Sequence, residues 1–264
     1  KAKSIAADAL ILDLEDSVAP EAKDDARQQV AAAIRSGGYG RRELVVRINS
    51  LDTPWGNDDL KMAADVAPDA VLIPKVETAD DIANVRRLFS HWGGSERTAM
   101  WAMIEKPPAI FNAREIAAAK PTCLVLGTND LIKETRVASE GSRIGLVPWL
   151  ATVVLAARVH GLDVVDGVYN DFKDEAGFRV ECEQGRQLGM DGKTLIHPSQ
   201  VAACNAVFSP SPSDVEWAHK VIASYSLPEN TSKGVITIEG RMVERLHRAM
   251  AERLVEIVGA ISHD

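Results

Sequence analysis

The sequence predicts an α/β fold with a parallel sheet, and three observations lead to this prediction. Short β-branched or leucine-rich runs recur along the chain, helix-like stretches separate them, and each run is continuously apolar rather than alternating. Continuous apolar runs are expected when both faces of a parallel strand are covered. Strands that alternate with helices indicate right-handed βαβ units, and therefore a parallel sheet.

The predicted strands are seven, at residues 7–16, 43–50, 70–77, 99–106, 122–130, 162–171 and 192–199. Predicted helices lie at residues 21–34, 78–89, 109–119, 146–161 and 175–190. Pro20 lies just before the first predicted helix and Thr78 begins the second, while Gly161 and Gly189 lie at the ends of the last two. Proline and threonine are favoured at helix starts and glycine at helix ends. Seven strands in single file, without a glycine-rich dinucleotide fingerprint, favour a TIM-type (β/α)₈ barrel over a doubly wound sheet.

One strand of such a barrel is missing from the prediction. The sequence begins at Lys1 without a methionine, and residues 1–6 resemble the tail of a helix that leads into the strand near Ala9. We therefore expect strand one and most of helix one to precede this sequence. An open barrel exposes two sheet edges, which proteins avoid, so those residues or another element would cover the gap.

The composition changes after Pro198, and we expect a barrel over residues 1–208 and a C-terminal helical extension over residues 209–264. The turn and cap cluster at 209–214 leads into an amphipathic helix at 214–225, and a loop at 227–234 precedes a strand-like run at 235–240. The last predicted helix covers residues 241–260. This tail is expected to lie on the barrel mouth or to reach across it.

The last predicted helix carries an apolar stripe at three- or four-residue steps: Met242, Leu246, Met250, Leu254 and Ile257. Such a stripe needs a partner surface, which is either the chain's own barrel or another copy of the chain. We expect a homo-oligomer, most simply a trimer.

Charge and cysteine content exclude several classes of protein. The 30 basic and 38 acidic residues give a net charge of −8, which opposes binding to nucleic acid or to an anionic membrane. Three cysteines without CxxC spacing argue against a disulfide framework and favour a reducing compartment, so we expect a cytoplasmic protein. No apolar run reaches the length of a membrane span, and the N-terminus does not follow the order of a signal peptide.

Charged residues end most of the predicted strands, where a (β/α)₈ barrel carries its functional groups. Glu105 and Asp130 end adjacent strands and offer only oxygen donors, which suits Mg²⁺ completed by water and substrate oxygens. The alternative is an ion network in which both carboxylates pair with Arg47 and Lys75. Spacing alone leaves this choice open.

Three further strand-end residues are candidates for substrate binding. Arg47 offers a planar fork that suits a carboxylate or a developing enolate oxygen. Lys75 and His197 are also assigned to substrate binding, although a Schiff base at Lys75 and a simple strand cap at His197 are the alternatives. Pro74 and the acidic pair favour the metal route over the Schiff base.

Six segments together resemble the HpcH/HpaI aldolase and citrate lyase β-subunit (CitE-like) family. They are LILDLEDSVAPEAKDDAR from Leu10, VVRINSLDTPWGNDDL from Val45, VLIPKVE from Val71, IEKPPAIFNA from Ile104, LGTNDL from Leu126, and the run from Asp166 to Val201 that contains GMDGKTLIHPSQ. The resemblance implies a TIM barrel that cleaves β-hydroxyacyl thioesters of citramalyl, malyl or citryl type, on coenzyme A or an acyl carrier, into an acetyl thioester and a 2-oxo acid.

The resemblance also implies roles for individual residues. Glu105 and Asp130 would bind Mg²⁺, Glu15 and Asp16 would hold metal-bound waters, and Arg47 would contact the substrate and the enolate. Such lyases are commonly trimers whose C-terminal segment closes over a neighbour's site, where Glu244 would act as general acid or base.

Two positions depart from the family pattern. Lys106 follows Glu105 where the family usually has threonine, and it either enters the barrel mouth or points outward as a solvated charge, which we expect. Glu244 stands where aspartate is usual. Two alternatives to the thioester lyase remain open: a metal-dependent 2-oxo acid aldolase, and a catalytically silent assembly or thioester-binding subunit.

Overall fold

The computed structural model describes residues 2–138 and 142–262. The chain forms two compact units that divide between Cys204 and Asn205. The boundary expected from the sequence, between residues 208 and 209, stays a prediction.

The first unit is built on a seven-stranded sheet whose strands follow one another in chain order. Every neighbouring pair is parallel. The strands are β1 (Ala9–Asp13), β2 (Glu43–Arg47), β3 (Ala70–Ile73), β4 (Ala99–Ile104), β5 (Cys123–Leu126), β6 (Asp163–Asp166) and β7 (Gly192–Lys193). All seven predicted strands and the parallel α/β fold are confirmed. A further strand ahead of β1 stays a prediction.

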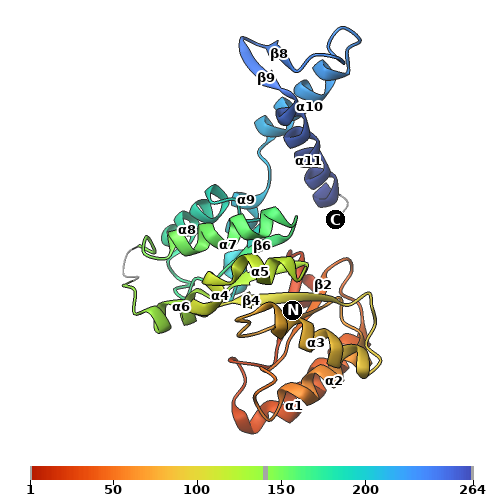
Figure 1. The fold of residues 1–264 in the computed structure, drawn as a ribbon, viewed down its shortest axis with the longest axis vertical. Helices are drawn as coiled ribbons and strands as arrows, with labels where there is room; N and C mark the ends of the chain where they lie inside the picture. The colour runs from red at the N-terminus through yellow and green to blue at the C-terminus, as the bar shows by residue number, and fades with distance from the viewer. Residues whose placement is uncertain (1, 139–141, 263–264) are drawn as a thin grey trace. The chain divides into compact units, whose positions relative to one another are not determined.

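Helices connect the strands and contact one another in the order α1, α2, α3, α5 and α7 (Figure 1). Their bounds are α1 (Lys23–Ser36), α2 (Gly56–Val66), α3 (Ala79–His91), α4 (Pro107–Phe111), α5 (Ala113–Ala118), α6 (Thr128–Thr135), α7 (Val147–Val159), α8 (Glu175–Gln187) and α9 (Val201–Phe208). Short 3₁₀ turns lie at Ala2–Ser4, Pro20–Ala22 and Pro198–Gln200.

The helices differ from the sequence-based expectation in several places: α2, α6 and α9 are additional helices, residues 128–130 begin α6 instead of ending a strand, and one expected helix is interrupted. The helix predicted over 109–119 is interrupted at Asn112, where the backbone leaves helical geometry at φ −94° and ψ 8°. The helix α2 was not predicted, because Pro54 and Gly56 at its start are typical turn residues. It forms because Leu60 and Ala63, one turn apart, are buried within the unit.

The core inside the sheet is a row of apolar side chains from one face of the strands. Its buried members are Val45, Ala70, Leu72, Trp101, Met103, Cys123 and Val125. Because side chains alternate along a strand, the same face continues at the strand ends as Asp13, Arg47 and Glu105. The apolar pattern of the core therefore fixes which polar residues lie above it.

The second unit consists of α10 (Pro212–Ser226), an antiparallel hairpin of β8 (Val235–Ile238) and β9 (Arg241–Glu244), and α11 (Arg245–Ser262). The predicted helix over 241–260 is wrong at its start, where residues 241–244 form β9. Glu239 and Gly240 take positive φ of 51° and 79°, which is the geometry of a two-residue hairpin turn. The buried Tyr225 hydroxyl donates to the Val243 carbonyl at 2.7 Å and joins the hairpin to α10.

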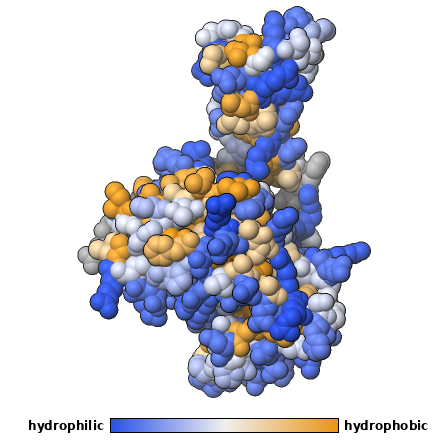
Figure 2. Space-filling view, in the orientation of Figure 1, coloured by the Kyte–Doolittle hydropathy of each residue, from blue (hydrophilic) through white to orange (hydrophobic). Residues whose placement is uncertain are grey.

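Apolar side chains are also exposed on both units. Figure 2 shows them gathered over α7 and α8, where the exposed members include Leu155, Val159 and Val180. On the second unit, Leu246 and Met250 are exposed on α11 and Met242 on β9, whereas Leu254 packs against the buried cluster. None of the helices in the described ranges combines the length and apolar character that a membrane crossing requires.

A buried charge cluster joins β6, β7 and α8. Asp166 is fully buried, and its carboxylate lies 2.8 Å from Arg143 Nη1 and 3.0 Å from Lys193 Nζ. Lys193 also pairs with Glu181 at 2.6 Å, and Arg143 Nε donates to Gln184 at 2.6 Å. Each charge in this cluster therefore has an opposite charge or a hydrogen-bond partner, which a buried ion requires.

Replacing Asp166 by asparagine is expected to destabilise the protein strongly. The substitution leaves Arg143 and Lys193 buried with only Glu181 to neutralise them, and breaking a buried pair costs roughly 3–5 kcal/mol. Urea unfolding should therefore show a loss of about 3 kcal/mol or more. Asp52→Asn, an identical change at an exposed loop residue, should stay within about 0.5 kcal/mol of the parent. Equal midpoints for the two variants would contradict the role given to Asp166.

Candidate active site

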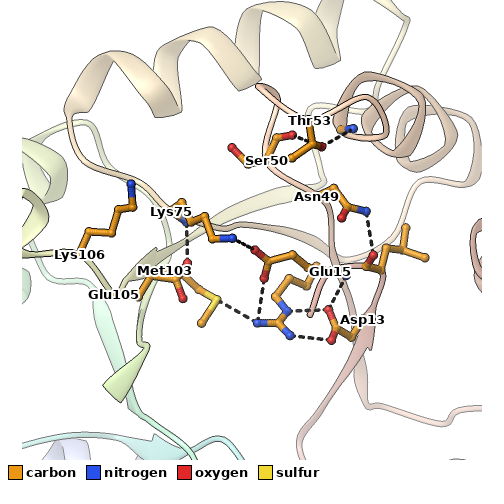
Figure 3. Close-up of polar contacts among 12 residues, drawn as sticks. Asp13, Glu15, Asn49, Ser50, Thr53, Lys75, Met103, Glu105 and Lys106 are labelled. Atoms are coloured by element: carbon orange, nitrogen blue, oxygen red, sulfur yellow. Dashed lines mark hydrogen bonds and ion pairs between the residues drawn. The ribbon is translucent and has the colours of Figure 1, made fainter. Parts of the chain in front are cut away.

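The ends of β1 and β2 meet in a two-pronged ion pair. Asp13 and Arg47 are register partners on the two strands, and Arg47 Nε and Nη2 each donate to Asp13 at 2.6 Å (Figure 3). Burial raises the pKa of the Asp13 carboxyl, but the hydrogen bonds and charge of Arg47 outweigh it and bring the pKa to about 2. Asp13 is therefore ionised at neutral pH and holds the guanidinium in place.

Glu15 lies in the turn after β1 and shares the same guanidinium. Its carboxylate is 3.1 Å from Arg47 Nη1 and 2.9 Å from Lys75 Nζ. The side chain is buried, and its two oxygens have ion-pair partners but no well-aligned hydrogen-bond donor in the described chain. Burial raises the pKa of Glu15 in spite of both cations. The negative charge of Glu15 is therefore only partly offset by the two cations.

Glu105 follows the last residue of β4 and is buried beside β3. The backbone N–H of Lys75 donates to Glu105 Oε1 at 2.7 Å, and Lys75 takes a positive φ of 53° in the turn that presents this N–H. Burial, with the nearby negative charges of Glu15 and Asp130, raises the pKa of Glu105 to about 7. The site thus holds carboxylates that repel one another in the absence of a further cation.

Six of the predicted site residues are brought together at these strand ends: Glu15, Asp16, Arg47, Lys75, Glu105 and Asp130. Asp130 lies in the first turn of α6, close enough for its charge to act on Glu105. Asp16 is exposed, and its charge acts on Glu15 and Arg47. In the described ranges no group of three or more His, Cys, Asp or Glu has metal-binding geometry, so a cation here would take two carboxylates.

The other two predicted site residues have different surroundings. His197 is exposed, stacks on Phe172 with ring centroids 4.6 Å apart, and lies with Nδ1 2.8 Å from the Ser199 hydroxyl. Glu244 belongs to the second unit, where its backbone N–H donates to His247 Nδ1 at 2.9 Å. The catalytic role of Glu244 and the substrate contact of His197 stay predictions.

Lys106 is directed away from Glu105 (Figure 3). Its backbone is extended, with φ −124° and ψ 148°, so consecutive side chains point to opposite faces. Its ammonium pairs with Glu77 at 2.6 Å, and Asn112 Nδ2 donates to the Glu77 carbonyl at 2.9 Å. The expectation of an outward direction agrees with this arrangement. The side chain is 35% exposed and its charge is paired with the similarly exposed Glu77, so its full solvation stays a prediction.

Three residues near these strand ends were not singled out by sequence reasoning. Asp13 ends β1, and its place opposite Arg47 across two neighbouring strands was a usable signal. Met103, whose sulfur lies 3.6 Å from Arg47 Nη1, belongs to an ordinary apolar strand pattern. Lys23 lies at the start of a polar, lysine-containing helix, and nothing in that pattern indicates that it is buried.

The chain is similar in sequence to known proteins and in fold to solved structures. The chain is 45% identical over 263 residues to a (3S)-malyl-CoA thioesterase of Cereibacter sphaeroides, covering 99% of this chain and 90% of that protein. It is 36% identical over 288 residues to an L-malyl-CoA/beta-methylmalyl-CoA lyase of the same species, covering 99% and 91%. A solved structure of CitE from Mycobacterium tuberculosis, in complex with magnesium, acetoacetate and coenzyme A, matches with a TM-score of 0.76 at 29% identity, covering 96% and 91% of the two chains.

Two family matches together cover residues 1–258, which include the whole parallel sheet. Residues 146–258 match the carbon–carbon bond lyases of the TIM-barrel fold, which confirms the predicted barrel and the predicted class of enzyme. Residues 1–198 match the HpcH/HpaI aldolase/citrate lyase family, and with the relatives above this shows that the chain belongs to that family.

Proposed function

We propose that the protein is a Mg²⁺-dependent lyase that cleaves the carbon–carbon bond of a β-hydroxyacyl thioester, of malyl, citramalyl or citryl type and most simply on coenzyme A. The products would be an acetyl thioester and a 2-oxo acid. One observation carries the proposal: the buried Glu105 carboxylate is repelled by the charges of Glu15 and Asp130, and Glu15 itself pairs with the fixed guanidinium of Arg47. A bound cation would offset the negative charge of the carboxylates, and the two anionic product groups would pair with this cation and with Arg47.

The residues at the strand ends suit Mg²⁺. Glu105 and Asp130 offer oxygen ligands only, which Mg²⁺ prefers. Burial raises the pKa of Glu105, the negative charges of Glu15 and Asp130 raise it further, and a divalent ion would neutralise this negative charge. Gly127 precedes α6 beside Glu105, and a Cβ there would lie 2.3 Å from Glu105 Cβ and 2.7 Å from Oε2. The glycine therefore leaves room for this carboxylate. When bound, Mg²⁺ supplies a Lewis acid and template for the oxygens of a 2-oxo acid.

Arg47 is proposed to stabilise the negative charge that forms on the thioester oxygen when the carbon–carbon bond breaks. Asp13 keeps the guanidinium oriented by two hydrogen bonds, so no reorganisation is needed at the moment of reaction. Burial would lower the pKa of Arg47, but Asp13 and then Glu15 raise it above its usual range. The group therefore acts as a permanent cation rather than as a proton donor.

The remaining residues are assigned as the sequence analysis has them, with Glu15, Asp16 and Glu244 taken from the family resemblance and Lys75 and His197 from their places at strand ends. Glu15 and Asp16 would hold water around the metal, Lys75 and His197 would bind anionic groups of the substrate, and Glu244 would move the proton at the acetyl methyl group. The Lys75 side chain is 37% exposed, which leaves part of it accessible to a ligand.

Thioester hydrolysis is a second candidate, because the relative that is 45% identical is a (3S)-malyl-CoA thioesterase. The two reactions start from the same class of substrate but differ in the bond that breaks. Lysis breaks a carbon–carbon bond and leaves the thioester intact, whereas hydrolysis adds water to the thioester and releases the thiol.

We also propose that the active form is a homotrimer in the cytoplasm. The exposed Leu246 and Met250 on α11 support an association surface, and the free, buried cysteines Cys123, Cys182 and Cys204 suit a reducing compartment. In such an assembly Glu244 would be supplied by a neighbouring copy.

Incubation of the purified protein with malyl-CoA and Mg²⁺ is expected to release glyoxylate and acetyl-CoA in equal amounts, because the thioester survives lysis. Citramalyl-CoA and citryl-CoA are assayed in parallel, with chromatography of the CoA species and a thiol reagent as the two readouts. Glu105→Gln protein purified in the same way controls for contaminating esterases. Release of malate with free CoA thiol would instead establish hydrolysis, and stability of all three thioesters would refute the proposed function.

Mg²⁺ titration by calorimetry is expected to show one saturable site in the absence of substrate. Glu105→Gln and Asp130→Asn should each weaken binding at least about tenfold, because each removes one of two charged ligands. Glu115→Gln, the same change at an exposed residue of α5, should bind as the parent does. A parent protein without measurable Mg²⁺ affinity, or variants equal to it, would contradict the assignment.

Sedimentation velocity at micromolar concentration is expected to give a trimer. Introducing charge on the exposed face of α11 by Leu246→Glu with Met250→Glu should shift the population to monomer, since a buried unpaired carboxylate is costly. Glu256→Gln on the same helix is the control and should leave the trimer intact. A parent protein that sediments only as monomer removes the neighbour's Glu244 from the mechanism.

A further inference from the structure

Lys23 is a buried lysine outside the set of residues assigned above. It is the first residue of α1 and is 6% exposed. Its ammonium donates three hydrogen bonds: to the Leu14 carbonyl at 2.8 Å, to the Glu15 carbonyl at 2.7 Å, and to Asn49 Oδ1 at 2.8 Å. All three donors of the ammonium are thus used.

This placement is unfavourable for a lysine on two grounds. The three acceptors are neutral oxygens, and a buried ammonium is costly when its hydrogen-bond partners carry no charge. A cation at the start of a helix also opposes the helix dipole. Packing alone is an insufficient account, because an apolar side chain of similar length would fill the space without either cost.

The contacts of Lys23 converge on the turn that carries Glu15. The two carbonyls belong to Leu14 and Glu15, and the Leu14 carbonyl also accepts from Asn49 Nδ2 at 2.7 Å. On the other side of the same turn, the Leu14 N–H donates to the Arg47 carbonyl at 2.9 Å. The peptide groups on both sides of Glu15 are therefore fixed, which sets the direction in which its side chain leaves the backbone.

Asn49 is itself held in one orientation. Its Nδ2 donates to Asp59 at 2.6 Å, and its backbone N–H donates to the same carboxylate oxygen at 2.9 Å. The other oxygen of Asp59 pairs with Arg27 at 2.7 Å. This chain of contacts connects α1, α2 and the turn after β2, and it presents Asn49 Oδ1 to Lys23 as a fixed acceptor.

We propose that Lys23 is a positioning residue of the active site: it holds the Leu14–Glu15 backbone so that the Glu15 carboxylate stays between Arg47 and Lys75. Glu15 lies 3.1 Å and 2.9 Å from these two cations, and a turn of the backbone would break both contacts. The catalytic part of this inference rests on the proposed function, whereas its structural part does not.

The expected kinetic effect is on kcat rather than on KM. Glu15 is one of the two carboxylates that hold the Arg47 guanidinium, and Arg47 is proposed to act on charge that develops only in the transition state. Loss of the Glu15 contact therefore lowers kcat while ground-state thioester binding is retained. A misplacement of about 1 Å can cost a large part of the rate. A residue that only stabilised the fold would change the melting temperature and leave the kinetic constants of the folded protein unchanged.

The test uses three variants of the full chain: Lys23→Met, Lys23→Arg and Lys61→Met. The first removes all three donors at similar length. The second keeps the positive charge and the donors, but its planar guanidinium does not converge on the same three oxygens, and it remains informative if the methionine variant fails to fold. Lys61 is exposed on α2, so Lys61→Met controls for the change in net charge.

The measurements are the crystal structures of the metal-free proteins, Mg²⁺ affinity by calorimetry, and kcat and KM for the thioester that the parent cleaves. We expect both Lys23 variants to lose the Glu15 contacts with Arg47 and Lys75 in the crystal. Lys23→Met should lower kcat at least about tenfold and Lys23→Arg at least about fivefold, each with KM within about threefold of the parent. Lys61→Met should match the parent throughout.

Two outcomes would overturn the proposal. One is a variant crystal structure in which Glu15 keeps both ion pairs, and the other is an unchanged kcat in the folded Lys23 variants. If the parent cleaves no thioester, the proposed function fails by itself. The crystal structures then still decide the role of Lys23, because they do not depend on turnover.

Discussion

The guanidinium of Arg47 is shared between two carboxylates at the end of β1, and the charged strand ends are arranged around this contact. Asp13 takes two of its hydrogen bonds and remains ionised because its pKa is held at about 2. Glu15 forms an ion pair with the remaining guanidinium nitrogen, Nη1, at 3.1 Å. Since Glu15 also pairs with Lys75, and the Lys75 N–H in turn binds Glu105, one cation on β2 connects the ends of four consecutive strands.

Two of the buried charge clusters in the described part of the first unit differ in a way that separates structure from function. Around Asp166, each carboxylate and cation meets a partner, and the cluster is a closed network. Around Glu105, burial and the charges of Glu15 and Asp130 raise the pKa of this carboxyl group to about 7. Carboxylates with a perturbed pKa at the carboxyl ends of barrel strands are typical of functional sites.

Membership of the HpcH/HpaI aldolase/citrate lyase family defines a class of chemistry rather than one reaction. Relatives at 45% and 36% identity carry the names of a thioesterase and a lyase, which act on the same kind of ester at different bonds. The orientation of Arg47 bears on this choice, because stabilising a thioester enolate requires its charge in a fixed place. Lys23 donates to the Leu14 and Glu15 carbonyls. These hydrogen bonds would help to keep Arg47 in that place, because Glu15 pairs with the guanidinium.

Patterns of neighbouring residues predict the seven parallel strands, the class of enzyme and the acidic strand ends, because these depend on apolar runs, on residues that start and end helices, and on short motifs. The prediction failed where local signals were ambiguous: α2 begins with turn residues, and residues 241–244 form a strand because the positive φ values of Glu239 and Gly240 turn the chain back. Only the tertiary structure decided which charges meet. Asp13 pairs with Arg47 because their strands are in register, Lys106 pairs with Glu77 across two loops, and Lys23 is buried although its own helix looks polar. These contacts join residues 26 to 34 positions apart or residues on different strands, and a pattern of neighbouring residues carries no information about distances of that kind.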